Sequence, residues 1–406
     1  MNVKITPGKA NGVVLVPPSK SMAHRMLICA GLAEGVSKVE NIELSEDIKA
    51  TLGMLEQLGA TYTIENRTVN ITGIGTKKVE LKAPLNSNES GSTLRFFIPI
   101  VLAKGMDATF VGAKRLLERP LSVYEELCKE QGILFEKEEG KLCVSGTLLA
   151  KHYKVRGDIS SQFITGLLFA LPLLEENSVL EVLPPIESKP YIDMTMEALK
   201  TFGIDIKQEE NLFYIPGKQS YQAKNVCVEG DYSNAAFLDA LTLIGGLVTT
   251  VGLREDSLQG DKIYQEYYQE LQKEEPKIDL TECPDLGPIL MGLAGALHGA
   301  SFTGTKRLKI KESDRGAVMA EELKKFGIRV EVGENEIIVF PGRLQTPTEK
   351  LSSHNDHRIA MTMATLCTIT GGTIEGADSV KKSFPSYFDV IESLGIRVTR
   401  LVETEE

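Results

Sequence analysis

The chain has 406 residues and a net charge of −11 at pH 7, with 42% apolar and 25% charged residues. This length exceeds what one hydrophobic core ordinarily holds, so we expect two domains. The acidic balance, the 6% aromatic content and the lack of Trp argue against a nucleic-acid-binding surface, which needs basic patches and stacking rings.

The N-terminal stretch MNVKITPGKANGVVLVPP alternates apolar and polar residues, as a β-strand does. It has no basic segment followed by an apolar run, and no apolar stretch of the chain reaches the roughly 18 residues of a membrane-spanning helix. The six cysteines form no CxxC pair, so neither a zinc site nor a disulfide framework is indicated. We therefore expect a cytoplasmic protein.

Five segments further along share one form: a helix that ends at a glycine, a short strand, a polar turn and a second strand. Their glycines are Gly59, Gly132, Gly203, Gly327 and Gly395. A glycine after the last helical turn is a common stop because it adopts the left-handed conformation without steric cost. A degenerate copy, around Tyr267–Leu280, fits the long gap before Gly327. The whole form recurs, which favours true repeats over αβ units that merely look alike. Six such units predict an α/β protein with three units per domain and sheets outside or between the helices.

Short polar stretches with a basic residue precede five predicted helices. They read SKSMAHR (19–25), NESGSTLRFF (88–97), GDISSQFITGLL (157–168), KIKESDRGAVM (309–319) and SHNDHRIAMTM (353–363). A helix N-terminus carries unpaired N–H groups and a partial positive charge, so hydroxyls and basic side chains there suit an anion. Any one of these starts can be an ordinary N-cap. Five of them, at corresponding places in the repeats, predict a ligand with several negative charges, such as two phosphates or phosphates with carboxylates.

Two carboxylates near these stretches are candidate acids and bases. Asp285 precedes an apolar helix, and Glu312 stands beside Lys311 and close to Arg315. A carboxylate among cations has a lowered pKa and can accept a proton from a substrate. The alternatives, helix capping for Asp285 and a surface ion pair for Glu312, stay open.

Signatures of cofactors are missing from the sequence. No P-loop and no dinucleotide fingerprint is present, so neither ATP nor NAD is implied. His354 and His357 stand three residues apart, which could suit a metal, but no Cys or carboxylate cluster joins them in sequence. We expect no metal and no organic cofactor.

Ten segments, in order along the chain, resemble the motifs of the 5-enolpyruvylshikimate-3-phosphate synthases of the enolpyruvyl transferase family. They are PPSKSMAHR, ESGSTLR, ERPLSVYEEL, DISSQFITGLL, ESKPYIDMT, VEGDYSNAAF, CPDLG, IKESDR, NDHRIAM and KKSFPSYF. The resemblance implies two domains, each with three similar units of an inside-out α/β barrel, and an active site in the cleft between them. It also implies two chain crossings, so that one domain holds residues 1–17 plus 232–406 and the other holds 18–231.

The same resemblance implies a reaction and its substrates. The enolpyruvyl group of phosphoenolpyruvate would move to the 5-hydroxyl of shikimate 3-phosphate through a tetrahedral intermediate, with release of phosphate. This step belongs to the shikimate pathway of aromatic amino acid biosynthesis. The expected partners are these two small molecules, without cofactor, nucleic acid or membrane, and the expected state is a monomer.

Residue roles are also implied by the resemblance. Lys20, Asp285 and Glu312 would be catalytic: Asp285 would take the proton from the 5-hydroxyl, while Glu312 and Lys20 would manage the proton at the methylene carbon. The residues expected to bind shikimate 3-phosphate are Lys20, Ser21, Arg25, Ser160, Ser161, Gln162, Ser188, Tyr191, Asp285 and Lys311. Those expected to bind phosphoenolpyruvate are Lys20, Gly91, Arg119, Gln162, Arg315, Arg358 and Lys382.

The chain departs from the family's common residues at three positions: Glu46 stands where Asp is common, and Glu89 and Arg307 each stand where Asn is common.

Three alternative functions remain open. A sister transferase acting on UDP-N-acetylglucosamine commonly carries a Cys in the loop VGAKRLLERP, which has none here. RNA 3′-phosphate cyclase needs RNA affinity, which the acidic composition disfavours. A polyanion-binding protein without chemistry would not need ionisable groups at all three expected catalytic positions.

Overall fold

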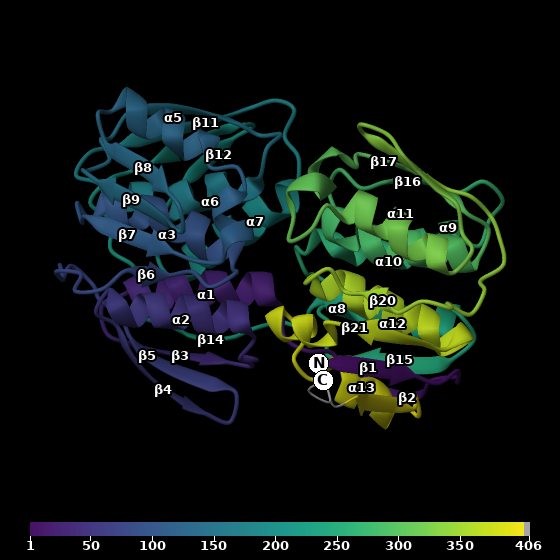
Figure 1. The fold of residues 1–406 in the computed structure, drawn as a ribbon. Helices are drawn as coiled ribbons and strands as arrows, with labels where there is room; N and C mark the ends of the chain where they lie inside the picture. Colours follow the sequence, from purple (N-terminus) through teal and green to yellow (C-terminus); the bar gives the residue numbers. More distant parts are fainter. Residues whose placement is uncertain (402–406) are drawn as a thin grey trace. The chain divides into compact units, whose positions relative to one another are not determined.

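The structure is a computed structural model that describes residues 1–401 (Figure 1). The chain forms two compact units. Unit 1 consists of Met1–Pro17 and Gly230–Glu406, and unit 2 of Pro18–Glu229. Each unit has a separate hydrophobic core. The chain therefore leaves unit 1 after its second strand and returns to it some 210 residues later, since 229 − 18 + 1 = 212.

Both units repeat one element order: a strand, a buried helix, a second strand, a second helix and a hairpin. Unit 2 has three complete repeats, one of them with two short helices in the second-helix place. Their elements are β14 (Asn225–Cys227), α1 (Lys20–Leu32), β3 (Val36–Glu40), α2 (Glu46–Gln57), β4 (Thr61–Glu65) and β5 (Thr68–Thr72); β6 (Leu85–Asn86), α3 (Gly91–Ala103), β7 (Ala108–Val111), α4 (Lys114–Glu118), α5 (Ser122–Glu130), β8 (Leu134–Glu138) and β9 (Lys141–Ser145); and β10 (His152–Arg156), α6 (Ser161–Ala170), β11 (Ser178–Leu183), α7 (Lys189–Thr201), β12 (Lys207–Glu209) and β13 (Leu212–Ile215).

Unit 1 has two complete repeats and one short one. The short repeat consists of β2 (Asn11–Leu15), α8 (Tyr232–Leu243), β15 (Leu247–Val251) and α9 (Tyr264–Glu270). The complete repeats are β16 (Lys277–Asp279), α10 (Gly287–Ala296), β17 (Ala300–Thr303), α11 (Arg315–Lys325), β18 (Val330–Val332) and β19 (Glu336–Val339), and then β20 (Leu351–Ser352), α12 (His357–Thr370), β21 (Gly372–Glu375), α13 (Tyr387–Ser393), β22 (Val398–Leu401) and β1 (Asn2–Ile5).

Five four-stranded sheets have the same pattern, in which a parallel pair is extended by two antiparallel strands. In four of them the antiparallel strands form a local hairpin. In the fifth they come from opposite ends of the described chain, because β1 pairs with both β21 and β22. The short repeat has only the parallel pair β2–β15. The degenerate copy predicted at 267–280 thus covers the end of α9 and then β16, which belongs to the next repeat.

The buried helices form the inner layer of each unit. The helix α10 reads GPILMGLAGA, which is apolar on every face, so nearly all of its residues are buried. Its counterparts α1, α3, α6, α8 and α12 are buried in the same way. The second helices are amphipathic, as α11 is. The outer strand of a hairpin is largely exposed, as in β4, whereas in the inner strand every second residue is buried, as in β5. The predicted α/β class, with sheets outside or between the helices, is confirmed.

The five predicted stop glycines all adopt positive φ angles, from 66° at Gly132 to 105° at Gly59. An L-residue with a side chain would be strained there, which explains why each helix ends at glycine. The helix starts differ from the prediction in one respect. Four of the five polar stretches precede the buried first helix of a repeat, whereas the stretch containing Arg315 precedes α11, a second helix. They are therefore not all at equivalent places.

Across residues 1–401, no helix combines the length and apolar character that crossing a membrane requires.

Candidate active site

Three equivalent helices of unit 2 begin at serines. The hydroxyl of Ser19 accepts a hydrogen bond from Met22 N at 3.2 Å, and Ser90 caps Thr93 N at 3.2 Å in the same way. Ser160 accepts from the backbone N–H of Gln162 at 3.3 Å. Each cap satisfies one of the N–H groups of the first turn and fixes where the helix begins. The predicted residues Ser160 and Ser161 therefore lie at a helix N-terminus, where anions are favoured.

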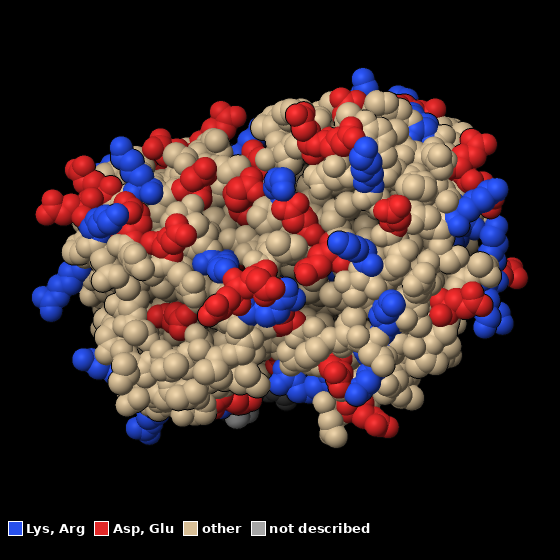
Figure 2. Space-filling model, turned by 180° about the vertical axis from the view of Figure 1, so that it is seen from behind, with Lys and Arg blue, Asp and Glu red and all other residues tan. Residues whose placement is uncertain are grey.

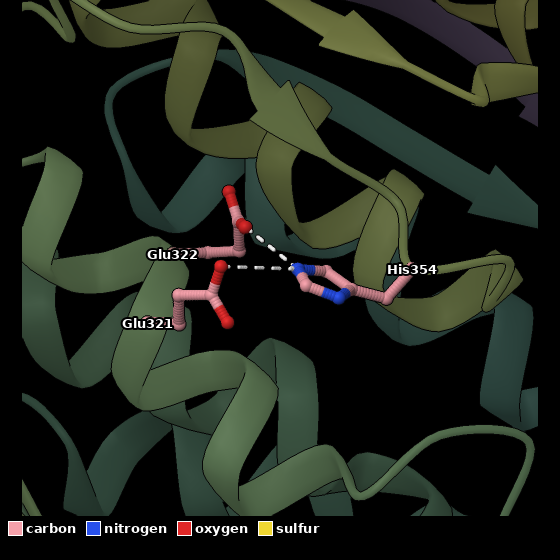
Figure 3. Close-up of side chains that lie close together, drawn as sticks. All are labelled: Glu321, Glu322 and His354. Carbon is pink, nitrogen blue, oxygen red and sulfur yellow. Dashed lines mark hydrogen bonds and ion pairs between the residues drawn. The ribbon is translucent and has the colours of Figure 1, made fainter.

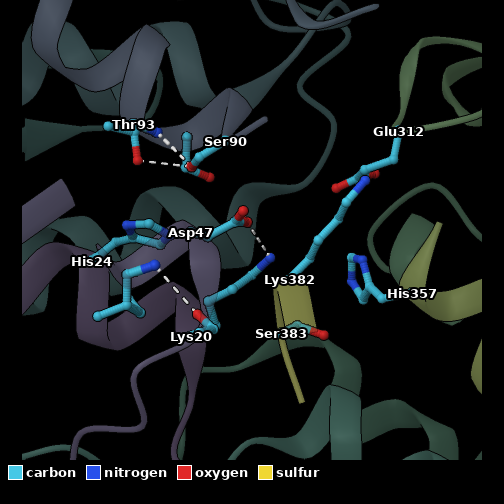
Figure 4. Close-up of polar contacts among 12 residues, drawn as sticks. Lys20, His24, Asp47, Ser90, Thr93, Glu312, His357, Lys382 and Ser383 are labelled. Atoms are coloured by element: carbon cyan, nitrogen blue, oxygen red, sulfur yellow. Dashed lines mark hydrogen bonds and ion pairs between the residues drawn. The ribbon is translucent and has the colours of Figure 1, made fainter. Parts of the chain in front are cut away.

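Lys20 forms an ion pair with Asp47 of α2. The Nζ–Oδ2 distance is 2.7 Å, and the two side chains are only 15% and 10% exposed. Figure 4 shows the ammonium and the carboxylate pointing toward one another. The neighbouring Glu46, one of the three departures from the family's common residues, forms an exposed pair with Lys49 at 2.9 Å. The signal for Asp47, an acidic residue in the first turn of a helix, was present but not specific.

Arg25 is buried among neutral groups. Its guanidinium donates to Thr195 Oγ1 at 2.9 Å, to the Ser21 carbonyl at 2.7 Å and to the Tyr191 carbonyl at 3.1 Å. A longer contact joins it to Thr165 Oγ1 at 3.5 Å, and its Cζ lies 5.9 Å from the centroid of the Tyr191 ring. Burial lowers the pKa of Arg25 to about 10. The predicted Ser21, Arg25 and Tyr191 are thus brought together by α1 and α7.

Gln162, a predicted site residue, bonds two residues of α3 that were not predicted as site residues. Its Oε1 accepts from Arg95 Nη1 at 2.8 Å, and its Nε2 donates to Ser92 Oγ at 2.9 Å. Arg95 also donates to the Pro120 carbonyl at 3.0 Å. The sequence analysis quoted Arg95 within its helix start but gave it no role, because one helical arginine carries no signal about what it faces.

Gly91 and Arg119 are in close contact. A Cβ atom at position 91 would stand 2.6 Å from Arg119 Nη1, closer than real Cβ contacts. Arg119 is 6% exposed, so a side chain at this position would displace its guanidinium. Ser188, the remaining predicted residue of unit 2, is buried at the start of α7 with φ 55°.

In unit 1, three carboxylates bond to the guanidinium of Arg315. Its guanidinium bonds Asp356 Oδ2 at 2.8 Å, Asp285 Oδ1 at 2.9 Å and Glu312 Oε2 at 2.7 Å. A further hydrogen bond joins Nη2 to Asp356 Oδ1 at 3.3 Å. Four of the five N–H donors of the guanidinium are used in this way, which leaves one for a ligand. Although burial opposes the charge, Asp356, Glu312 and Asp285 together raise the pKa of Arg315.

Asp285 is held by two more cations. Lys311 Nζ lies 3.2 Å from its Oδ1, and Arg358 Nη2 lies 3.7 Å from its Oδ2. Burial lowers the pKa of Lys311, and the positive charge of Arg315 lowers it further while Asp285 raises it. Lys382, also predicted, is 7% exposed and donates to the Asn355 carbonyl at 2.5 Å. The predicted residues of unit 1 therefore lie around α11 and the starts of α10 and α12.

Asp261 is a further buried carboxyl group of unit 1 that the sequence analysis did not single out. It is 3% exposed and accepts a short hydrogen bond from Ser233. Burial raises its pKa to about 7, with a further contribution from the negative charge of Asp285, while Arg358 opposes the rise. A carboxyl group that ionises near neutral pH next to a candidate base affects the charge of the whole cluster.

His354 and His357, considered above as a possible metal-binding pair, do not belong to one group of possible metal ligands. Among residues 1–401, one group of side chains could hold a metal ion, and it consists of Glu321, Glu322 and His354 (Figure 3). His354 Nε2 lies 2.7 Å from Glu322 Oε1, but Lys325 Nζ also lies 2.9 and 3.0 Å from the two oxygens of Glu322. Glu322 therefore already has a cationic partner, Lys325, in addition to its contact with His354. His357 is not part of the group.

The positions that depart from the family pattern lie in ordered surroundings. Arg307 is buried in the 3-10 helix Lys306–Ile310 and donates to the Thr281 carbonyl. Its charge contributes to the lowered pKa of Lys311, after burial and the charge of Arg315. Glu89 directly precedes the capping Ser90.

On the face drawn in Figure 2, acidic and basic side chains are interspersed. Arg25, Arg119 and Arg315, by contrast, are buried within the units.

The repeat fold and the two cationic clusters fit the class of the enolpyruvyl transferases. A family model described as EPSP synthase (3-phosphoshikimate 1-carboxyvinyltransferase) matches residues 5–391. A protein of Clostridium kluyveri named 3-phosphoshikimate 1-carboxyvinyltransferase is 41% identical, over 97% of both chains, and one of Clostridium botulinum with the same name is 39% identical, over 97% of both. The solved EPSP synthase of Acinetobacter baumannii superposes with a TM-score of 0.79 at 25% identity, covering 98% of this chain and 100% of that one. This chain belongs to the EPSP synthase family.

Proposed function

We propose that this chain transfers the enolpyruvyl group of phosphoenolpyruvate to the 5-hydroxyl of shikimate 3-phosphate and releases phosphate, as a step of the shikimate pathway. Its relatives carry the name of this activity. The observation that supports it most directly is the set of cations at helix starts in both units, because both substrates carry a phosphate and a carboxylate.

Shikimate 3-phosphate is assigned chiefly to unit 2. Ser160 and Ser161 at the N-terminus of α6, with Ser188 at the start of α7, would bind its phosphate. Arg25 has one N–H donor beyond its four contacts, and Tyr191 lies beside it. The other residues proposed to bind this substrate are Lys20, Ser21, Gln162, Asp285 and Lys311, and Lys20 is proposed to bind phosphoenolpyruvate as well.

Phosphoenolpyruvate is assigned to groups of both units. The guanidinium of Arg119 packs against Gly91 at the N-terminus of α3, where it would bind the anion. Gln162 lies at the start of α6. Arg315, Arg358 and Lys382 supply positive charge from unit 1. Charge-assisted hydrogen bonds from such preorganised cations stabilise a phosphate that gathers charge as it leaves.

The proton transfers are assigned to three residues. Asp285 would take the proton of the 5-hydroxyl as its oxygen bonds to C2 of phosphoenolpyruvate, and Lys20 with Glu312 would supply a proton to the methylene carbon. In the tetrahedral intermediate the C–O bond to phosphate would then break, and a proton of the methyl group would return to the pair of Lys20 and Glu312 as the double bond is restored. Lys311 Nζ and Arg315 Nη1 lie 3.2 and 2.9 Å from Asp285 Oδ1 and would hold this carboxylate in place for the transfer.

The two compact units are proposed to act as the two domains of one enzyme, to which both contribute residues. We propose no metal or organic cofactor, a monomer, and a cytoplasmic location.

The test is phosphate release from phosphoenolpyruvate in chelated buffer, with shikimate 3-phosphate or UDP-N-acetylglucosamine as the acceptor. Release with shikimate 3-phosphate alone supports the proposal. Release with the nucleotide sugar alone would assign the chain to the sister activity. No release with either acceptor would contradict a catalytic role.

A further inference from the structure

Two contacts, one helical turn apart, join α1 to α2. In the first, Lys20 Nζ bonds Asp47 Oδ2 at 2.7 Å. In the second, His24 Nδ1 lies 2.8 Å from Thr51 Oγ1. Residues four apart lie on the same face of a helix, so His24 and Thr51 stand one turn behind the Lys20–Asp47 pair. The second contact therefore fixes the register in which the proposed catalytic lysine meets its carboxylate.

The second contact continues to α3. Thr51 Oγ1 lies 2.8 Å from Thr93 Oγ1, and Thr93 Oγ1 donates to Ser90 Oγ at 2.7 Å. Ser90 is the N-cap of α3, next to Gly91. Four side chains thus form one unbroken series of hydrogen bonds from α1 through α2 to the start of α3, and Figure 4 shows three of them, His24, Thr93 and Ser90.

All members of this series are buried. His24, Ser90 and Thr93 are 1%, 1% and 0% exposed, and Thr51 is 0% exposed. Buried hydroxyls without competing water keep one direction of donation, and each bond in such a series polarises the next.

The direction of donation follows from Ser90. Its oxygen accepts both from Thr93 Oγ1 and from Thr93 N at 3.2 Å, which uses both of its lone pairs. Because Thr93 gives its proton to Ser90, it must accept from Thr51, and Thr51 must in turn accept from His24. The ring proton of His24 therefore lies on Nδ1. The other nitrogen, Nε2, is buried with no hydrogen-bond partner among the described residues.

The imidazole is also held neutral. Burial lowers the pKa of His24 well below its usual value of 6.5, and the charges of Lys20 and Arg25 lower it further. A neutral ring with its proton on Nδ1 is the form that the series needs.

We infer that His24 is a positioning residue, whose Nδ1–H orders Thr51, Thr93 and Ser90 and so holds the start of α3 and the Lys20–Asp47 pair in one geometry. The inference rests on the proposed function only for its effect on turnover. Ser90, having accepted twice, keeps its own O–H as a donor at the helix start that is assigned to phosphoenolpyruvate.

Two substitutions separate hydrogen bonding from packing at position 24. His24→Asn keeps an N–H donor near the place of Nδ1 but loses volume, whereas His24→Leu keeps the volume and loses the donor. We expect the Leu variant to lower kcat/KM for phosphoenolpyruvate about 5- to 30-fold, the effect of one or two lost hydrogen bonds. The Asn variant should stay within about 3-fold of the parent, since its donor is retained.

Thr51→Val tests the next member, and Thr368→Val is its matched control. Thr368 is also a buried helical threonine, but its hydroxyl donates to the Thr365 carbonyl of its own helix. We expect Thr51→Val to lower kcat/KM as much as His24→Leu, and the double variant to be no worse than either, because residues in one series are not additive. Thr368→Val should lose stability without this loss of turnover.

The tautomer is measured without substrate. With ¹⁵N-labelled histidine, the chain gives signals from five residues, and the one absent from His24→Asn belongs to His24. We expect a protonated Nδ1 and a bare Nε2. A proton on Nε2 would overturn the inference, and so would a Leu variant that is more active than the Asn variant. A parent protein without turnover would overturn the proposed function instead, and the tautomer would then decide the inference alone.

Discussion

Arg25 of unit 2 and Arg315 of unit 1 are both buried, but they are held by different kinds of acceptor. In unit 2, Arg25 is held by hydroxyls, carbonyls and an aromatic ring, and Arg95 by an amide and a carbonyl. In unit 1, Arg315 is held by three carboxylates. Neutral acceptors leave a cation's charge available to a bound anion, whereas carboxylates balance it. The difference teaches that Arg25 can offer its charge to a bound anion, whereas the charge of Arg315 is largely balanced by the carboxylates that hold it in place.

The largest expected effect concerns the proton transfer. Asp285→Asn removes the proposed base while keeping the size of the side chain, and we expect kcat to fall by roughly 10² to 10⁴, the usual contribution of a general base. Steady-state phosphate release measures it. Asp314→Asn is the matched control, because Asn also caps a helix well and Asp314 caps α11. Equal kcat values in the two variants would remove Asp285 from the mechanism.

Replacing the central arginine of each unit compares the two kinds of surroundings directly. Arg315→Met leaves three carboxylates facing one another, so we expect a loss of about 3–5 kcal/mol in the free energy of unfolding. Arg25→Met leaves only neutral acceptors, for which about 1–3 kcal/mol is expected. Urea denaturation of both variants gives the comparison. The opposite order of stabilities would show that the carboxylates of unit 1 do not depend on Arg315.

The pH dependence of the free energy of unfolding should reveal the raised pKa of Asp261. The folded state keeps its proton up to about pH 7, whereas an unfolded aspartate releases it near 3.8. The unfolded state therefore binds fewer protons between these values, and stability falls as the pH rises through this window. Asp261→Asn removes the ionisation, so it should be more stable than the parent at pH 8 by roughly 2–4 kcal/mol and similar at pH 4. Urea midpoints across this range test it, and a parallel pH dependence in both proteins would contradict it.

The smallest effect is expected at Gly91. A methyl group there meets Arg119 Nη1, so Gly91→Ala should shift the guanidinium and raise KM for phosphoenolpyruvate about 5-fold, the effect of about 1 kcal/mol. Gly53→Ala is the control, because a Cβ at position 53 of α2 meets nothing within 4 Å. Saturation curves for each substrate measure both variants. An unchanged KM in Gly91→Ala would show that Arg119 does not act from this place.

Local features of the fold could be predicted because each has a local cause. The stop glycines need left-handed backbone, and the polar helix starts need caps, so Gly59 and Ser90 both have signals within a few residues. The missing hairpin of the short repeat and the pairing of β1 with β22 have no such signal. Those features depend on which distant strands meet, and similar strand patterns are compatible with several pairings.

The candidate site was predictable as a set of residues but not as a set of contacts. Asp47, Arg95 and Asp261 were missed because each acts through a partner from another element: Asp47 through Lys20, and Arg95 through Gln162. A sequence shows that a residue can ionise, but the direction of its side chain is set by packing. The series from His24 to Ser90 spans three helices and could not be read from any one of them.

The separation of β1 and β2 from their partners has a consequence during synthesis. Unit 2 has all of its strands once residue 229 has been made, so it can fold as a complete body on the ribosome. Val3 and Ile5 of β1 are made first, yet they wait for β21 and β22, which are made near the end. The sheet that contains β1 is therefore completed only after unit 2 has been made, and β1 has no strand partner until then.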